Sequence, residues 1–184
     1  MNGVHLADLP LSGKLFCTLF LLGIGCGAVA AFTQAATAVG LSPAEVQASL
    51  APEMPMTHIQ HGHGQTSGEK EISLGDISSA ARVWMRTPLL IQTSHTHLFG
   101  QTLIAGLLGL IFLFSSLGER SKSVVIALPF VGTLIDIGGM WLTRFVWPPL
   151  GVLVIAGGSL FALGYLVITV VSLYELWLKR ERIA

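Results

Sequence analysis

The chain contains few charged residues. Lysine, arginine, aspartate and glutamate make up 11 % of its 184 residues, whereas a soluble domain carries about 25 %. The 10 basic and 10 acidic residues cancel, so no excess of positive charge favours nucleic acid as a partner. Hydrophobic residues account for 52 %, and the mean hydropathy is +0.72. This composition predicts an integral membrane protein in contact with the lipid bilayer.

Cysteine and catalytic motifs are also scarce. The two cysteines, Cys17 and Cys26, both lie in the first apolar run. Nine residues apart on a helix, they face opposite directions, which excludes a disulfide between them. The sequence contains no nucleophile–base constellation, phosphate-binding loop or pair of catalytic carboxylates. We therefore expect no catalytic activity of its own.

Four long apolar runs are each long enough to cross a membrane, which takes about 20 residues. They predict an all-α bundle of four transmembrane helices, at residues 15–38, 95–117, 123–143 and 150–178. The predicted connections are an N-terminal segment at 1–14, a large loop with short amphipathic helices at 39–94, turns at 118–122 and 144–149, and a C-terminal segment at 179–184.

The first run has a second interpretation. Residues 35–38 (AATA) offer small-residue sites for cleavage of a signal peptide. The run is longer than the apolar part of most signal peptides, and only Lys14 flanks it, so a retained helix is favoured. Gly23 and Gly27 form a G-x-x-x-G pattern that lets another helix approach closely.

Two short helices are expected in the polar loop. Residues 42–45 (SPAE) supply an N-cap, a proline at the first helical position and a capping-box glutamate, so a helix should run to about Leu50. A second, amphipathic helix is expected between Asp76 and Pro88. It would lie in the membrane interface, with Trp84 at the level of the headgroups.

The distribution of basic residues predicts the orientation of the bundle in the membrane. Six lie on the side of the two termini, and four lie on the side of the large loop: Lys14, Arg120, Lys122, Lys179, Arg180 and Arg182, against Lys70, Arg82, Arg86 and Arg144. The positive-inside rule then predicts cytoplasmic termini and an external loop. In a bacterium this places the protein in the inner membrane with a periplasmic loop.

Five of the six histidines fall on this external side. Three of them lie in the loop beside two methionines: His58, His61 and His63, with Met54 and Met56. Imidazole binds several transition metals and haem iron, and thioether sulfur binds copper, so copper is favoured over zinc. The alternative is a solvated loop whose histidines bind nothing.

His95 and His97 stand at the predicted start of the second membrane helix, and Gln101 follows His97 by one turn. Residues two apart on a helix point roughly 200° away from each other, so both histidines cannot bind one ion there. If Ser94 caps the helix, His95 can lie in less regular backbone. The alternative is a pair of interfacial histidines bonded to headgroups or backbone.

Asp136 lies inside the third helix, where a carboxylate needs a partner. It should sit about 10 Å below the external end, at the depth of His97 and Gln101 on the second helix. We therefore expect a hydrogen bond from His97 or Gln101 to Asp136. In a metal or haem site this carboxylate would orient the imidazole. A purely structural bond between the helices is the alternative.

Two stretches resemble a group of small four-helix bacterial membrane proteins of unassigned role. They are residues 95–100 (HTHLFG) and residues 136–144 (DIGGMWLTR). The resemblance covers the three C-terminal crossings and implies no activity. The His-x-His element is also similar to the paired haem ligands of haem–copper oxidases, whose other ligating helices this chain lacks.

These features favour a non-catalytic membrane subunit that binds haem b or a transition metal at the external face. Its predicted ligands are His95 and His97, with the loop histidines completing the shell and Asp136 in support. Its role would be electron transfer or metal handling in a larger complex or homo-oligomer. The alternative is a structural or assembly subunit without a cofactor. A transporter is the weakest interpretation, because four crossings with one buried acid leave little room for a pathway.

Overall fold

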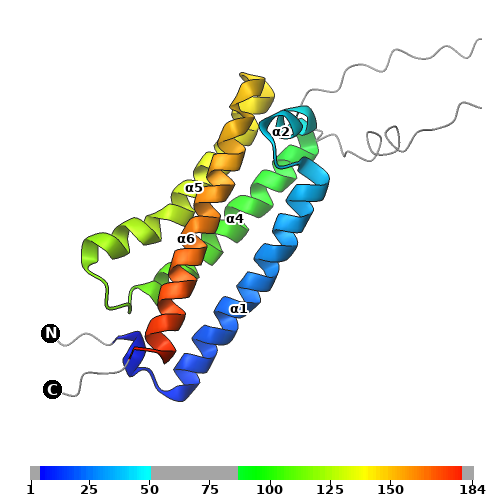
Figure 1. The fold of residues 1–184 in the computed structure, drawn as a ribbon. Coiled ribbons are helices and arrows are strands. Elements are labelled where there is room, and N and C mark those ends of the chain that lie inside the picture. The colour runs from blue at the N-terminus through cyan, green and yellow to red at the C-terminus, as the bar shows by residue number, and fades with distance from the viewer. Residues whose placement is uncertain (1–4, 51–86, 180–184) are drawn as a thin grey trace, which may run out of the picture.

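A computed structural model describes residues 5–50 and 87–179, and within these ranges every regular element is a helix. Four helices are long and apolar enough to cross a membrane, and they form one elongated bundle (Figure 1). They are α1 (Leu11–Gln34), α4 (Thr87–Phe112), α5 (Glu119–Phe145) and α6 (Gly151–Trp177). Shorter elements are η1 (Leu6–Asp8), η2 (Ala35–Val39), α2 (Pro43–Leu50) and η3 (Pro148–Leu150). The predicted all-α fold with four membrane helices is confirmed.

Several predicted helix boundaries are wrong. The largest error is at the second crossing, which begins at Thr87 rather than at residue 95. Pro88 lies in the first turn of α4, where a proline is tolerated because that turn uses no backbone N–H. Ser94 is consequently an internal residue of α4 and caps nothing.

The other crossings are shifted by fewer residues. The first begins at Leu11 instead of residue 15, and its helical path continues through the π-turn η2. The third runs from Glu119 to Phe145, and so includes residues assigned to both flanking turns. In each case an apolar run underestimates the helix, because polar residues at its ends also adopt helical backbone.

Helices α5 and α6 form the centre of the bundle and touch backbone to backbone. Glycines make this approach possible: a Cβ atom on Gly132 would lie 2.6 Å from the Phe161 nitrogen, and one on Gly157 would lie 2.3 Å from the Asp136 nitrogen. Gly139 and Gly164 meet α6 and α5 in the same way. The two glycines of each helix are seven residues apart, so they recur on one face.

Helix α1 is joined to α6 by two hydrogen bonds. The Tyr165 hydroxyl donates to the Leu21 carbonyl over 2.9 Å, and Trp177 Nε1 donates to Thr18 Oγ1 over 2.9 Å. Gly25 gives the tyrosine access, because a Cβ there would lie 2.8 Å from the hydroxyl. Few other residues of α1 are buried against the rest of the protein, so these two bonds fix the position of α1.

Helix α2 closes one end of the bundle, called here the α2 end. Its predicted capping box is confirmed, because Ser42 N donates to Glu45 Oε2 over 3.0 Å and Glu45 N donates to Ser42 Oγ over 3.3 Å. The helix buries an apolar cluster against α4 and α5: Val46, Leu50, Leu90 and Met140. Arg144 Nη1 donates to the Leu50 carbonyl over 2.9 Å. The C-terminal carbonyls of α2 thus offer this arginine an acceptor.

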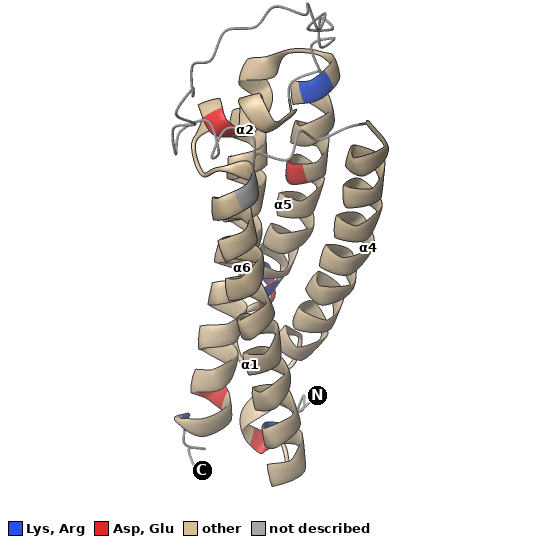
Figure 2. Ribbon diagram, turned by 90° about the vertical axis from the view of Figure 1, so that its right-hand side faces the viewer, with Lys and Arg blue, Asp and Glu red and all other residues tan. Residues whose placement is uncertain are grey.

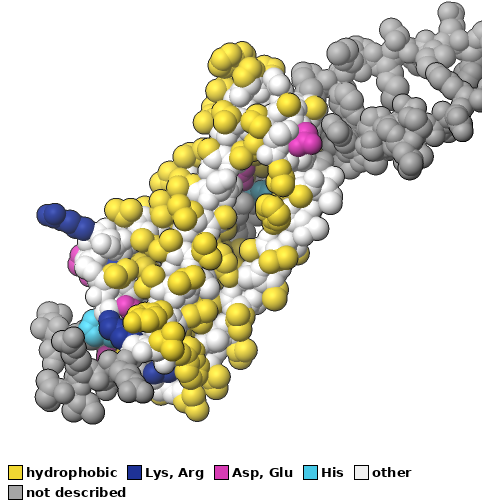
Figure 3. Space-filling view, in the orientation of Figure 1, with side chains coloured by type: hydrophobic (Ala, Val, Ile, Leu, Met, Phe, Trp, Pro, Cys, Tyr) yellow, Lys and Arg dark blue, Asp and Glu magenta, His cyan; other side chains and the backbone are white. Residues whose placement is uncertain are grey.

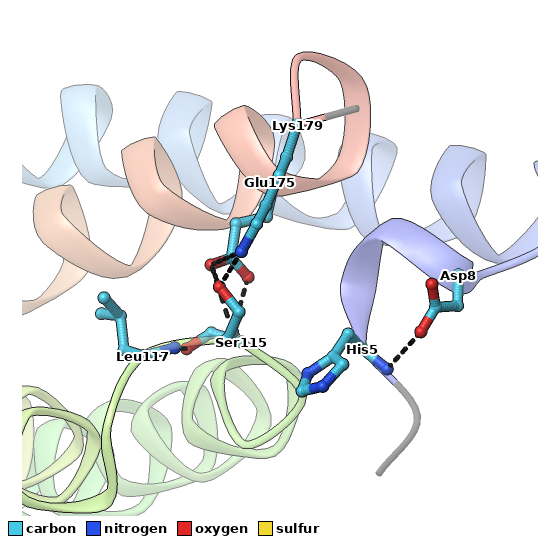
Figure 4. A network of polar contacts seen from close by, with 7 residues as sticks. His5, Asp8, Ser115, Leu117, Glu175 and Lys179 are labelled. Atoms are coloured by element: carbon cyan, nitrogen blue, oxygen red, sulfur yellow. Dashed lines mark hydrogen bonds and ion pairs between the residues drawn. The ribbon is translucent and has the colours of Figure 1, made fainter. Parts of the chain in front are cut away.

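The opposite end of the bundle, called here the terminal end, carries both termini (Figure 1). A polar network joins its segments (Figure 4). Leu6 is fully buried, and its N–H donates to the Phe114 carbonyl over 2.9 Å. The backbone nitrogen of Ser116, in the turn after α4, donates to the two carboxylate oxygens of Glu175 on α6, over 3.1 and 2.9 Å. Leu6 and Glu175 are thereby both fixed to the turn between α4 and α5.

Candidate functional site

Charged residues are concentrated near the ends of the helices, and the acidic position within α5 is an exception (Figure 2). That residue, Asp136, has 8 % of its side chain exposed, and its Oδ2 lies 3.9 Å from Nδ1 of His97 on α4. In the space-filling view a histidine and an acidic side chain lie together in the half nearer the α2 end (Figure 3). The two helices therefore bring His97 and Asp136 together, as their depths predicted.

The contact is longer than a hydrogen bond, which joins nitrogen and oxygen at about 2.7–3.2 Å. The expected hydrogen bond is therefore absent, and His97 Nδ1 has no partner although the atom is buried. Gln101, one turn along the same face, has a buried Oε1 that is likewise unpartnered. A buried polar atom without a hydrogen bond costs about 1–3 kcal/mol. These atoms can be satisfied by a bound group or by water.

The ring of His97 has one closed side and one open side. Its Nδ1 is buried toward Asp136, whereas 43 % of the whole side chain is exposed. The rest of the side chain is therefore partly open. A carboxylate behind one ring nitrogen is the arrangement in which proteins commonly hold a metal-ligating histidine through the other nitrogen.

His95 lies on a different face of α4. It is exposed, and its ring packs against Phe99 with the two ring centres 4.8 Å apart. The regular helix around it contradicts the possibility of looser backbone at this position. One chain therefore does not bring His95 and His97 to a common ion.

A second contact between α4 and α5 lies nearer the α2 end. Trp141 Nε1 donates to Ser94 Oγ over 2.8 Å, and the indole stacks on Phe145 with ring centres 5.5 Å apart. Ser94 is three residues before His97, on the same side of α4. This bond holds the two helices together beside the His97–Asp136 contact.

Among the residues that the structure describes, no group of three or more His, Cys, Asp or Glu side chains is close enough to hold a metal ion. His97 and Asp136 supply two suitable side chains. The predicted loop ligands lie outside the described residues: Met54, Met56, His58, His61 and His63. The amphipathic helix expected between Asp76 and Pro88 also falls largely outside them.

The sequence reasoning missed a second buried acid. Glu175 has 4 % exposure, and its carboxylate accepts hydrogen bonds from Ser116 N and Oγ and lies 3.6 Å from Lys179 Nζ. In the sequence, Glu175 is an acidic residue near the end of the last apolar run, one helical turn before Lys179. Such a position is typical of an exposed helix end, and only the structure shows that Glu175 faces inward.

A family model for a transmembrane helical domain matches residues 86–183, just over half of the chain. The match covers α4, α5 and α6, and α1 lies outside it. It agrees with the resemblance to small membrane proteins over the three C-terminal crossings. No curated protein and no solved structure matches the chain.

Proposed function

The chain belongs to the Aq_1264 family of transmembrane helical domains, and we propose that it is a membrane subunit that binds haem b or a transition metal through His97. Copper is favoured over zinc. The observation that carries this proposal is the buried, unpartnered Nδ1 of His97 facing the Asp136 carboxylate at 3.9 Å. Asp136 is the orienting group, and Nε2 is the ligand atom.

The carboxylate has a specific task in this proposal. In metal sites, a histidine ligand usually donates its second ring N–H to a carboxylate or carbonyl, which fixes the ring and raises its basicity. Hydrogen bonds of this kind can be long before a ligand binds and shorten afterwards. Gln101 adds a further polar group one turn along α4, with a buried Oε1 that can accept a hydrogen bond.

One histidine does not complete a coordination shell, so other ligands must reach the α2 end. Helix α2 ends at Leu50 and α4 begins at Thr87, and both of these points lie at the α2 end. The sequence between them is residues 51–86. This segment contains His58, His61 and His63, the proposed further ligands. His95 is exposed and is available to a second copy of the chain or to another subunit.

We place the α2 end on the external side of the membrane, because six of the ten basic residues belong to the terminal side. Both termini are then cytoplasmic, and the setting is a bacterial inner membrane. A redox group at the external face suits electron transfer or metal handling in a larger complex. No catalytic activity of its own is proposed.

The test is an absorption spectrum and an elemental analysis of the purified protein, expressed with haem and copper available. We expect either a Soret band with reduced α and β bands or stoichiometric metal, lost in His97→Ala. The matched control is His95→Ala, which removes the same side chain from another face of α4. If neither haem nor metal is bound, the proposal fails and a structural or assembly subunit becomes the better interpretation. Exposed glycines such as Gly23 and Gly27, with no atom within 4 Å of an added Cβ, would then be candidate packing positions.

A further inference from the structure

Helix α6 carries a stripe of polar side chains in an otherwise apolar sequence. The stripe consists of Tyr165, Thr169, Ser172 and Glu175. Spacings of four, three and three residues place these side chains on one side of a helix. Ser172 is fully buried, between Ile168 and Leu176 of the apolar core. The stripe therefore faces the interior of the bundle.

The hydroxyls of Thr169 and Ser172 are buried and have no hydrogen-bond partner. Seven other helix hydroxyls in the described residues donate to the carbonyl four residues earlier: Thr18, Thr33, Thr37, Thr96, Ser123, Thr133 and Thr143. Thr169 and Ser172 do not make this bond. Ordered water is the usual partner of a buried polar group that finds none in the protein.

At the terminal end the stripe reaches Glu175. Its carboxylate accepts hydrogen bonds from Ser116 and lies beside Lys179, which also donates to the Ser116 hydroxyl (Figure 4). The Lys179 side chain is 40 % exposed. Glu175 therefore connects the buried hydroxyls to the water-exposed end of the bundle.

Toward the α2 end, the stripe and α4 share the apolar core of the bundle. Tyr165 and Ile104 pack against the same apolar core, and Gln101 lies one turn from Ile104 on α4. The Gln101 Oε1 is a buried, unpartnered acceptor, and the partly exposed His97 follows it by one more turn.

We propose that water molecules bound at these side chains form a proton path through the bundle, from Glu175 past Ser172 and Thr169 to Gln101; the Tyr165 hydroxyl donates to the Leu21 carbonyl and stays outside the relay. Glu175 takes a proton from the water phase at the terminal end and passes it to the water at Ser172. Each hydroxyl or water along the path accepts one proton and releases one, so none changes its charge after a transfer. This path requires no bound metal or haem, although it ends at Gln101, which also belongs to the site proposed above.

The test measures proton flux in vesicles of phosphatidylcholine and phosphatidylglycerol that contain the full chain and the pH-sensitive dye pyranine. A potassium gradient with valinomycin drives the flux. We expect faster pH change than in protein-free vesicles, and a decrease of about tenfold in Thr169→Val, which replaces one hydroxyl of the path by a methyl group. Glu175→Gln and Ser172→Ala should lower the flux similarly.

The matched control is Thr133→Val. Its hydroxyl is also buried, but it donates to the Pro129 carbonyl and lies outside the path, so this change should leave the flux within about twofold of the unchanged protein. Thermal unfolding in detergent confirms that Thr169→Val is folded. A flux equal to that of protein-free vesicles overturns the proposal. So does an equal response of Thr169→Val and Thr133→Val.

Discussion

Helix α5 packs against α4 and against α6 in opposite ways. Toward α6 the backbones touch through Gly132, Gly139 and Gly157. Toward α4 the contacts near the α2 end are polar: the indole of Trp141 bonds Ser94, and Asp136 faces an imidazole 3.9 Å away. Backbone contact leaves no room for a ligand. The α5–α6 interface is therefore a scaffold, and the α4–α5 interface carries the candidate site.

Asp136 takes part in both interfaces. Its backbone nitrogen lies against Gly157 of α6, and its carboxylate faces His97 of α4. The close packing on one side therefore fixes the position of the carboxylate on the other. Side chains of a binding site are held accurately when rigid, well-packed elements support them.

The largest expected effect is a break in the α5–α6 interface. Gly157→Ala places a Cβ at 2.3 Å from the Asp136 nitrogen, so the helices must separate, and we expect a loss of about 3 kcal/mol in the free energy of unfolding. The control is the neighbouring Gly158→Ala, because nothing lies within 4 Å of an added Cβ at Gly158. Thermal unfolding in detergent measures both. Equal stability of the two variants would contradict backbone contact at Gly157.

The next effect concerns the α4–α5 interface and rests on the proposed function. Asp136→Asn should weaken binding of metal or haem about 10- to 100-fold, because the neutral amide no longer supports the His97 imidazole. The fold should remain intact, since the Asp136 backbone still packs on Gly157. Titration with copper or haem measures the affinity. Glu119→Gln removes the same charge from an exposed position of α5 and should bind normally. A similar loss in both variants would show that charge alone matters.

A smaller effect is expected where α1 meets α6. Gly25→Ala should cost about 1–2 kcal/mol, because the new methyl meets the Tyr165 hydroxyl at 2.8 Å and displaces its bond to Leu21. In a Tyr165→Phe background the same substitution should cost much less, since no hydroxyl is left to displace. The double-mutant cycle should give a coupling of about 1 kcal/mol. Additive effects would mean that this tyrosine does not hold α1.

The smallest effect should come from Ser94→Ala. It removes the acceptor of the Trp141 indole, and the net value of one hydrogen bond is about 0.5–1.5 kcal/mol. Thr96→Ala is the comparison, because the exposed Thr96 hydroxyl bonds only its own helix at the Gln92 carbonyl. Thermal unfolding should show a lower midpoint for Ser94→Ala alone. If the two variants are equally stable, the Ser94–Trp141 bond does not hold α4 to α5.

The sequence by itself determined the crossings and several local features. Apolar runs of about 20 residues cannot be exposed to water, so the four membrane helices followed from length and composition. The capping box at residues 42–45 predicted α2, because its hydrogen bonds are local. The separation of His95 from His97 followed from helix geometry. The meeting of His97 with Asp136 followed from the depth of each residue along its helix.

Only the tertiary structure decided which faces of these helices meet. Gly157 packs against α5 and Gly158 does not, although the two are neighbours in the sequence. Glu175 looked like an ordinary residue near a helix end, but its carboxylate is buried against the turn after α4. The structure alone also shows that the hydroxyls of Thr169 and Ser172 are buried without a hydrogen-bond partner. A sequence gives the period of each helix, whereas the rotation of one helix against another depends on the packing of all of them.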